Sequence, residues 1–208
     1  MPELFGLEGR SVRLLPLSPD HVEGLLEAAT ADRSSFGYTV VPADRATMTE
    51  YVERALARRA AGEQVPFATW SVALGRVVGS TRFYDIAQWE WSPVLPRPGD
   101  TGRAVDSVCI GHTWIEPAAQ RTPVNTEGKV LMLDHAFGTW GVRVVRLWTD
   151  ARDARSRGAI ERLGCSFDGV LRADRPAADG TVRDSAVFSM LAGEWPAARR
   201  LLMERLDT

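Results

Sequence analysis

The middle of the chain alternates between strand-like and helical patterns. Residues 105–115 and 144–149 are rich in strand formers, whereas residues 125–140 and 154–163 repeat apolar side chains at helical spacing. Because a helix between two neighbouring strands joins strands that run the same way, this order predicts at least one parallel pair with a right-handed crossover.

The flanking segments predict antiparallel hairpins and further helices. Strands are expected at 11–17, at 67–73 and 77–84 around Gly75-Arg76, and at 165–171 and 182–191 around the turn 178–180. One helix is expected after Ser18 as N-cap and Pro19, one from Thr47 with Glu50 as a capping box, and one from about 194 to 206. The full order predicts a mixed α/β chain with about seven strands in one central sheet flanked by helices.

Composition limits both the architecture and the classes of partner. The chain has 208 residues without a repeat or a linker, so we expect a single domain over 1–208. A net charge of −2 argues against a dedicated nucleic-acid-binding domain, and no apolar run reaches the ~20 residues of a membrane helix. The first ten residues lack the pattern of a signal peptide, and Cys109 and Cys165 are expected to be buried free thiols. These features together predict a cytoplasmic protein.

Motifs of several other enzyme classes do not occur. The sequence has no G-x-G-x-x-G for a dinucleotide and no G-x-S-x-G nucleophile elbow. His21, His112 and His135 do not have the spacing of zinc ligands. A nucleotide oxidoreductase, a serine hydrolase and a zinc hydrolase are therefore disfavoured.

Several short motifs follow one another from Ile110 onward. They are G-H-T-W on a strand that ends at a proline, a loop into a helix with an early glutamate, a strand ending in T-D, then S-R-G-A-I-E-R-L-G and D-G-V-L-R. In this order and spacing the chain resembles the GNAT superfamily of acyl-CoA-dependent N-acyltransferases. More narrowly, it is similar to the group that contains the ribosomal-protein N-terminal acetyltransferases. The resemblance runs from about Leu7 to the last strand and implies the GNAT fold, whose central sheet is splayed at its middle.

The resemblance assigns a coenzyme A site to the loop before the central helix. The family's glycine-rich pyrophosphate loop aligns with Gln120, Arg121, Thr122, Pro123, Val124 and Asn125, followed by Thr126. Such a loop offers unpaired N–H groups and the positive end of a helix dipole. Pro123 and Asn125 occupy the two glycine positions, and a proline has no N–H to donate.

The same resemblance gives roles to a strand end and to the next helix. Backbone groups at Trp114 and Ile115 are expected to hold the pantetheine arm in the splayed gap. Asp153 stands where family members often have asparagine, so it either contacts the arm or only caps the helix. Ser156 matches a serine that can protonate the leaving thiolate, and Arg157 is a candidate phosphate contact.

A general base is harder to assign. Many family members have an acidic residue two positions before the glycine that corresponds to Gly111, and here that position is Cys109. The ribosomal-protein group has an acidic residue after the G-V-L-R strand, and here that position is close to Asp174 but falls on Arg175. His112 remains as a catalytic candidate and a substrate contact, because its ordinary pKa suits a proton acceptor. The alternation of Ile110, His112 and Trp114 suggests one face of the strand, where a histidine can equally be structural.

Tyr84, Trp89 and Trp91 lie in or beside a long loop expected over 85–104. They are candidates for a substrate wall, for core packing or for a homodimer contact.

The predicted function is acyl transfer from acetyl-CoA to an amine of a protein N-terminus, an amino acid or a small metabolite. The amine attacks the thioester directly and no metal is needed. Two alternatives remain open: N-succinyl transfer from succinyl-CoA, and a non-catalytic domain that binds CoA or serves as an interaction module.

Overall fold

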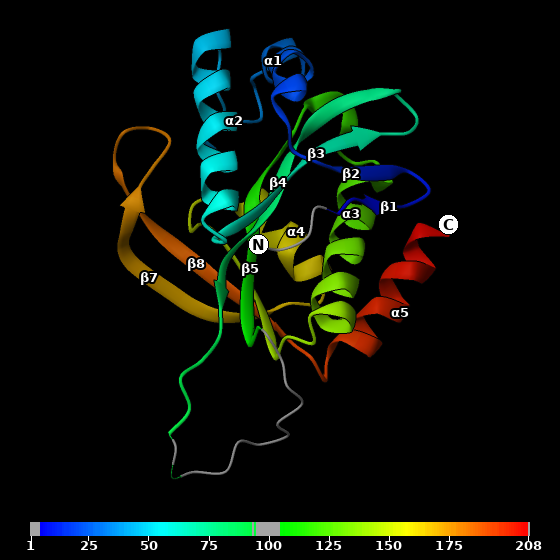
Figure 1. Cartoon of the computed structure of the whole chain (residues 1–208), viewed down its shortest axis with the longest axis vertical. Helices are drawn as coiled ribbons and strands as arrows, with labels where there is room; N and C mark the ends of the chain where they lie inside the picture. The colour runs from blue at the N-terminus through cyan, green and yellow to red at the C-terminus, as the bar shows by residue number, and fades with distance from the viewer. Residues whose placement is uncertain (1–4, 93, 95–104, 208) are drawn as a thin grey trace.

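The computed structural model describes residues 5–92, 94 and 105–207, and its strands form one eight-stranded sheet. The expected loop 85–104 therefore lies partly outside the described residues. The sheet order is β1-β2-β3-β4-β5-β6-β8-β7 (Figure 1). The strands are β1 (Leu7–Glu8), β2 (Val12–Pro16), β3 (Gln64–Ser71), β4 (Arg76–Ala87), β5 (Ser107–Ile115), β6 (Val144–Asp150), β7 (Ser166–Pro176) and β8 (Val182–Leu191).

The expected mixed sheet is confirmed. β5 and β6 form its parallel pair, whereas the other neighbouring strands in the described sheet are antiparallel. The eighth strand is the two-residue β1, which pairs Leu7 with Leu14 of β2. A strand this short has too few residues to show an alternating pattern, so the sequence predicts only seven.

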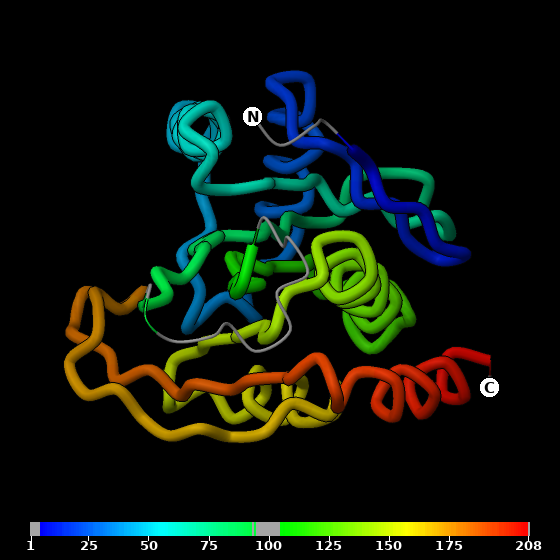
Figure 2. The backbone as a smooth tube through the Cα atoms, turned by 60° about the horizontal axis from the view of Figure 1, so that its bottom comes forward, coloured from blue at the N-terminus to red at the C-terminus, as the bar shows by residue number. Residues whose placement is uncertain are grey.

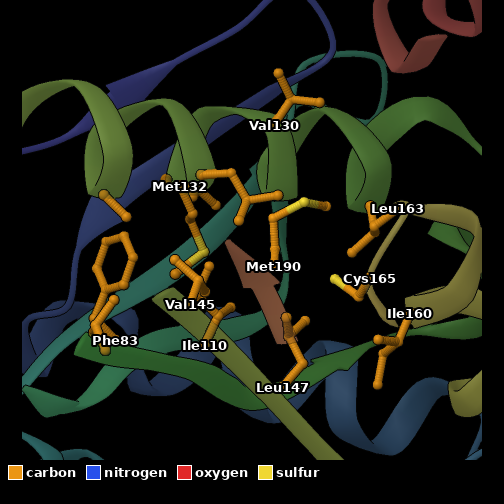
Figure 3. Packing of buried hydrophobic residues seen from close by; sticks show 14 of the residues in the cluster. Phe83, Ile110, Val130, Met132, Val145, Leu147, Ile160, Leu163, Cys165 and Met190 are labelled. Atoms are coloured by element: carbon orange, nitrogen blue, oxygen red, sulfur yellow. The ribbon is translucent and has the colours of Figure 1, made fainter. Parts of the chain in front are cut away.

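Two layers of helices cover the sheet (Figure 2). On one face lie α1 (Val22–Ala31) and α2 (Arg45–Ala60), which share a core cluster around Leu25, Met48 and Val52. On the other lie α3 (Pro123–Asp134), α4 (Ala154–Arg162) and α5 (Trp195–Leu206). Figure 3 shows α3 above the buried strand residues Ile110, Val145 and Leu147.

One expected helix start is wrong, and another expected helix is not α-helical along its whole length. The second helix begins at Arg45 rather than near Thr47, because the N-cap is Asp44, whose carboxylate accepts the N–H of Thr47 at 2.9 Å. The helix expected over 125–140 is α3 followed by a π-helical turn at His135–Thr139, and Gly141, with φ of 64°, ends it. The predicted Ser18 cap is confirmed, although Pro19 opens a 3₁₀ turn (Pro19–His21) that leads into α1.

The early glutamate of the central helix has a structural role. The Glu127 carboxylate is buried and accepts the backbone N–H groups of Arg10 at 2.8 Å and Ser11 at 2.6 Å. These charge-assisted bonds tie the β1–β2 turn to α3. Among the helices that are described, none has the length and apolar character needed to cross a membrane.

Candidate active site

The parallel strands β5 and β6 part at the centre of the sheet. They are paired from Ser107 with Val144 to Ile110 with Leu147, and no pair joins the rest of β5 to the rest of β6. β6 remains paired with β8 as far as Asp150, so the gap lies between β5 and β6 alone. Backbone groups on the facing edges of the two strands are therefore open to a ligand that extends along them.

A β-bulge turns the end of β5. Arg82 of β4 pairs with Gly111 and Ser80 with Trp114, so β5 has one residue more than β4 across this interval. His112 takes up the extra residue with φ of 49°. The expected single face for Ile110, His112 and Trp114 is therefore wrong, because Ile110 packs in the α3 core and Trp114 in the α1–α2 core.

Gly79 permits the close approach of β4 to this bulge. A Cβ atom at Gly79 would stand 2.0 Å from the carbonyl oxygen of Trp114. No side chain fits there, so the glycine is needed for the strand pairing beside the gap.

A cavity of about 800 Å³ opens from the gap. β5 lines it from Ile110 to Ile115, β6 lines it from Leu147 to Thr149, and α2, α3, α4, β7 and β8 contribute further side chains. Of the residues singled out from the sequence, these line the cavity: Tyr84, His112, Trp114, Ile115, Gln120, Arg121, Thr122, Asn125, Thr126, Asp153 and Ser156.

The loop before α3 ends in an N-terminus that suits an anion. Thr122 is the N-cap and its hydroxyl accepts the N–H of Val124, while Pro123 occupies the first helical position. A proline at that position breaks no intrahelical hydrogen bond. Arg121 has φ of 60° and lines the cavity together with Asn125, so a guanidinium and an amide lie beside the helix end.

Gln120 connects three segments at the rim of the cavity. Its Nε2 donates to the Ile115 carbonyl and to Ser35 Oγ, both at 2.8 Å, and its Oε1 accepts from Arg155 at 3.0 Å. Arg155 also donates to the carbonyl of Ser35 at 2.6 Å. The loop after β5, the start of α4 and the segment after α1 are thereby held together.

The first turn of α4 presents Ser156 to the cavity. Asp153 is buried, and its carboxylate accepts the N–H of Ser156 at 2.9 Å, so Asp153 is the N-cap of α4. The Ser156 hydroxyl is half-buried and makes no hydrogen bond to any residue that the structure describes. It is therefore available to a group in the cavity.

Lys129, which the sequence analysis did not single out as a site residue, is buried and lines the cavity. Its Nζ donates to Thr113 Oγ1 at 2.7 Å and to Thr81 Oγ1 at 3.0 Å, and within the described chain it makes no ion pair. Burial lowers the pKa of this amine to about 7. The helical spacing could have indicated that Lys129 is buried. The chain's single lysine stands four residues before the buried Leu133 and therefore on the inward face of α3.

His112 is a weak base in this site. Its ring contacts that of Tyr84, with the two ring centres 5.1 Å apart, and reaches the cavity. Burial against the protein, followed by the positive charges of Arg82, Arg175 and Arg183, lowers the pKa of His112 to about 3. Cys109 is no better, because burial raises the pKa of its thiol to about 12.

Other candidates lie outside the cavity lining. Trp89 bonds to Asp106 and Ser107, and Trp91 packs under the Arg143 guanidinium. Arg157 lies over the ring of Phe167 and donates to the Ala151 carbonyl. Val124 is part of the α3 core, and Asp174 is bonded to Arg175 and Ser185. In the described part of the chain, no three histidine, cysteine, aspartate or glutamate side chains gather as metal ligands.

The chain belongs to the GNAT acetyltransferase family. The family model described as the acetyltransferase (GNAT) domain matches residues 11–166, which is most of the chain. A search of the curated proteins finds no match.

Solved structures with the same fold are numerous. A GCN5-related N-acetyltransferase from Brucella melitensis is 27% identical, with 99% of this chain and 86% of that chain covered and a TM-score of 0.83. A protein described as a putative acetyltransferase from T. thermophilus is 30% identical over 99% and 98%, with a TM-score of 0.77. Mycobacterium smegmatis RimJ in complex with CoA-disulfide is 18% identical over 93% and 88%, with a TM-score of 0.75, which is a likeness of fold.

Pro123 gives a test of the loop. Replacing Pro123 by glycine adds one N–H donor at the first helical position but loosens the loop. A hydrogen bond to a charged group contributes roughly 1.5–3 kcal/mol, which the added loop entropy opposes, so Pro123→Gly is expected to keep or tighten the affinity for CoA. Calorimetry with free CoA measures this, and a large loss of affinity would show instead that the proline fixes the binding shape of the loop.

Proposed function

We propose that this protein is an acyl-CoA-dependent N-acyltransferase that uses acetyl-CoA. The observation that carries the proposal is the parting of β5 from β6 after Ile110 and Leu147, which opens into the 800 Å³ cavity. The open strand edges suit an extended arm with amide groups, since such an arm can bond to main chain as a further strand does. The complex of M. smegmatis RimJ with CoA-disulfide is consistent with a CoA site in this fold.

The cavity residues divide into two groups by their chemistry. Arg121, Thr126, Asn125 and the free N–H groups of α3 form the end that suits a pyrophosphate. Ser156, His112 and the bulge of β5 belong to the part of the lining that we assign to the reacting groups. Lys129 and Thr113 also line the cavity, where the hydrogen bond between them makes part of the lining polar.

The proposed reaction needs no covalent enzyme intermediate. An amine nitrogen bonds to the carbonyl carbon of acetyl-CoA, the carbon–sulfur bond breaks, and the electron pair leaves with sulfur. Ser156 Oγ–H donates to the departing sulfur and is reprotonated from water. The amine proton passes to water in the cavity, because His112 is too weak a base and Cys109 holds its own proton.

Turnover with defined amines tests this proposal. Acetyl-CoA or succinyl-CoA is mixed with the protein and a panel of amino acids, small amines and peptides with free N-termini, and release of the CoA thiol is followed. Cys109 and Cys165 are buried with raised thiol pKa values, so the protein's own thiols contribute little to this signal.

Mass spectrometry then identifies the amide product and the acyl group transferred. Amine-dependent thiol release with acetyl-CoA supports the proposal, and a preference for succinyl-CoA would change the donor. If CoA binds but no amine in the panel promotes thiol release, the protein is a non-catalytic CoA-binding domain. The cytoplasmic location and the homodimer remain predictions.

A further inference from the structure

Three arginine side chains lie close enough to His112 for their charges to act on its ring. The positive charges of Arg82, Arg175 and Arg183 all act on the His112 ring and lower its pKa. Arg175 and Arg183 are paired across β7 and β8 and both line the cavity. Arg82 lies on β4 over the ring of Tyr51, 4.8 Å from its centre, and Tyr51 also lines the cavity. We call Arg82, Arg175 and Arg183 the arginine cluster.

The arginine cluster has unused donors and little negative charge. Arg82 is 5% exposed, and only its Nη1 bonds to a described residue, Gln64 Oε1 at 3.0 Å, which leaves Nε and Nη2 without a partner among those residues. Arg183 bonds through Nε to Ser185 Oγ at 2.9 Å, and both burial and the charge of Arg175 lower its pKa. Leaving buried charged donors unpaired is costly, so a missing partner is expected at this place.

The nearby acids do not supply that partner. Asp174 accepts hydrogen bonds from Arg175 Nε and Ser185 Oγ, both at Oδ2 and both at 2.6 Å, and among the described residues no hydrogen bond joins it to Arg82 or Arg183. Asp150 is bonded to Arg152 through both carboxylate oxygens. Asp85, whose charge acts on Tyr84 and Cys109, is an exposed side chain. The neighbouring charges therefore leave the arginine cluster with an excess of positive charge.

A tryptophan adds another unused donor to the same wall. Trp148 Nε1 is buried without a partner in the described chain, and the Arg175 guanidinium lies 4.9 Å from the centre of the Trp148 ring. Trp148 lines the cavity as well. Every unused group here is a donor, so the ligand that satisfies them must present acceptor oxygens.

We propose that the arginine cluster binds a carboxylate carried by the acyl acceptor, so that the substrate is an amine with an acidic group, such as an amino acid. This inference rests on the proposed function. Guanidinium groups are suited to this task because they bind carboxylates through two parallel hydrogen bonds and remain charged when buried. The rival source of the carboxylate is the distal end of a succinyl donor.

Equilibrium binding tests the carboxylate site without requiring that the protein catalyse acyl transfer. With free CoA saturating, calorimetry compares amino acids with the corresponding amino acid amides, which keep the amine but lack the carboxylate. We expect the carboxylate forms to bind at least about tenfold more tightly to the wild-type protein, and Arg183→Gln to weaken them by about 10–100-fold. Arg58→Gln is the matched control, because Arg58 is an exposed residue of α2 that is paired with Glu63.

Two further readouts exclude a merely structural role for Arg183. Burial, followed by repulsion from Arg175, outweighs the attraction of Asp150 and Asp174 and lowers the pKa of Arg183. Arg183→Gln is therefore expected to keep or raise the midpoint of thermal unfolding while it loses the carboxylate ligand. If that variant does not fold, Arg175→Gln replaces it. Binding of the carboxylate is also expected to raise the pKa of His112, measured by NMR of the three histidine rings.

Several results would overturn the proposal. If the amides bind as tightly as the free amino acids, or if neither binds, the cluster does not bind a carboxylate of the acceptor. A loss of CoA affinity in Arg183→Gln would assign the cluster to a CoA phosphate. A third result would assign the cluster to the acyl donor. In that case the wild-type protein binds succinyl-CoA more tightly than acetyl-CoA, Arg183→Gln removes this difference, and the amino acids bind no more tightly than their amides. If none of the amines is acylated, the proposed function is contradicted. The binding measurements still decide whether the arginine cluster binds a carboxylate.

Discussion

Replacing Ser156 by alanine is expected to lower kcat by about ten- to a thousandfold while the Kd for acetyl-CoA changes little. The Ser156 hydroxyl lines the cavity and has no partner among the described residues. A hydrogen bond to the departing sulfur strengthens only as negative charge develops there, so it lowers the barrier more than it stabilises bound acetyl-CoA. Ser156→Cys, with a more acidic but poorer donor, is expected to fall between. Steady-state kinetics together with calorimetry measure the two quantities separately.

Thr47→Ala is a closely matched control for this substitution. Thr47 has the same place in α2 that Ser156 has in α4, with its N–H accepted at 2.9 Å by an aspartate N-cap, but it is exposed and outside the cavity lining. A Ser156→Ala enzyme with full kcat and weakened CoA binding would make Ser156 a binding residue. If neither quantity moves, the serine is only part of the helix surface and the proton comes from water.

Replacing Lys129 by methionine is expected to change how stability depends on pH. Burial lowers the pKa of Lys129 in the folded protein from 10.5 to about 7. Below pH 7 both the folded and the unfolded chain carry the proton, and the folded state bears the full cost of a buried ammonium. Between about pH 7 and 10.5 only the unfolded chain still binds the proton, so the free energy of unfolding rises with pH.

The size of this effect follows from the pKa shift. One pKa unit corresponds to about 1.4 kcal/mol, so from pH 6 to pH 9 the wild-type free energy of unfolding is expected to rise by roughly 2–3 kcal/mol relative to Lys129→Met. Thr81 and Thr113 are hydrogen-bonded to each other at 2.8 Å, so both hydroxyls are expected to keep a partner in the variant. Urea unfolding at the two pH values measures the difference, with Arg54→Met on the exposed face of α2 as control. Parallel pH profiles for wild type and Lys129→Met would show that Lys129 keeps an ordinary pKa.

Local patterns predicted most of the fold because each strand or helix could be recognised within its own segment. The parallel unit from residue 105 to 163 and the two hairpins follow from apolar periodicity and turn residues, and the structure confirms them. The N-cap of α2 was misplaced because Asp44 and Thr47 both carry capping side chains, and only the backbone conformation shows which one caps the helix.

The sequence could indicate cavity-lining residues only where they lie on a contiguous stretch of chain. Gln120, Arg121, Thr122, Asn125 and Thr126 of the loop do line the cavity, together with Asp153 and Ser156. The bulge at His112 could not be read from β5 alone, because it depends on the register against β4. The arginine cluster combines residues 82, 175 and 183, which only the sheet brings together.

Amide hydrogen exchange with and without acetyl-CoA tests most directly whether the gap between β5 and β6 holds the acyl-CoA arm. Without ligand, the amides of residues 111–115 and 148–150 that face the gap have no partner on the opposite strand. With acetyl-CoA at 100 times its Kd, binding adds about 2.7 kcal/mol to the stability of the folded protein. Amides that exchange only after acetyl-CoA has been released are therefore expected to exchange roughly a hundredfold more slowly. Peptides from β1 and β2, at the far edge of the sheet, serve as the control. The account predicts protection at residues 111–115 and 148–150, and saturating acetyl-CoA that leaves these amides unprotected would contradict it.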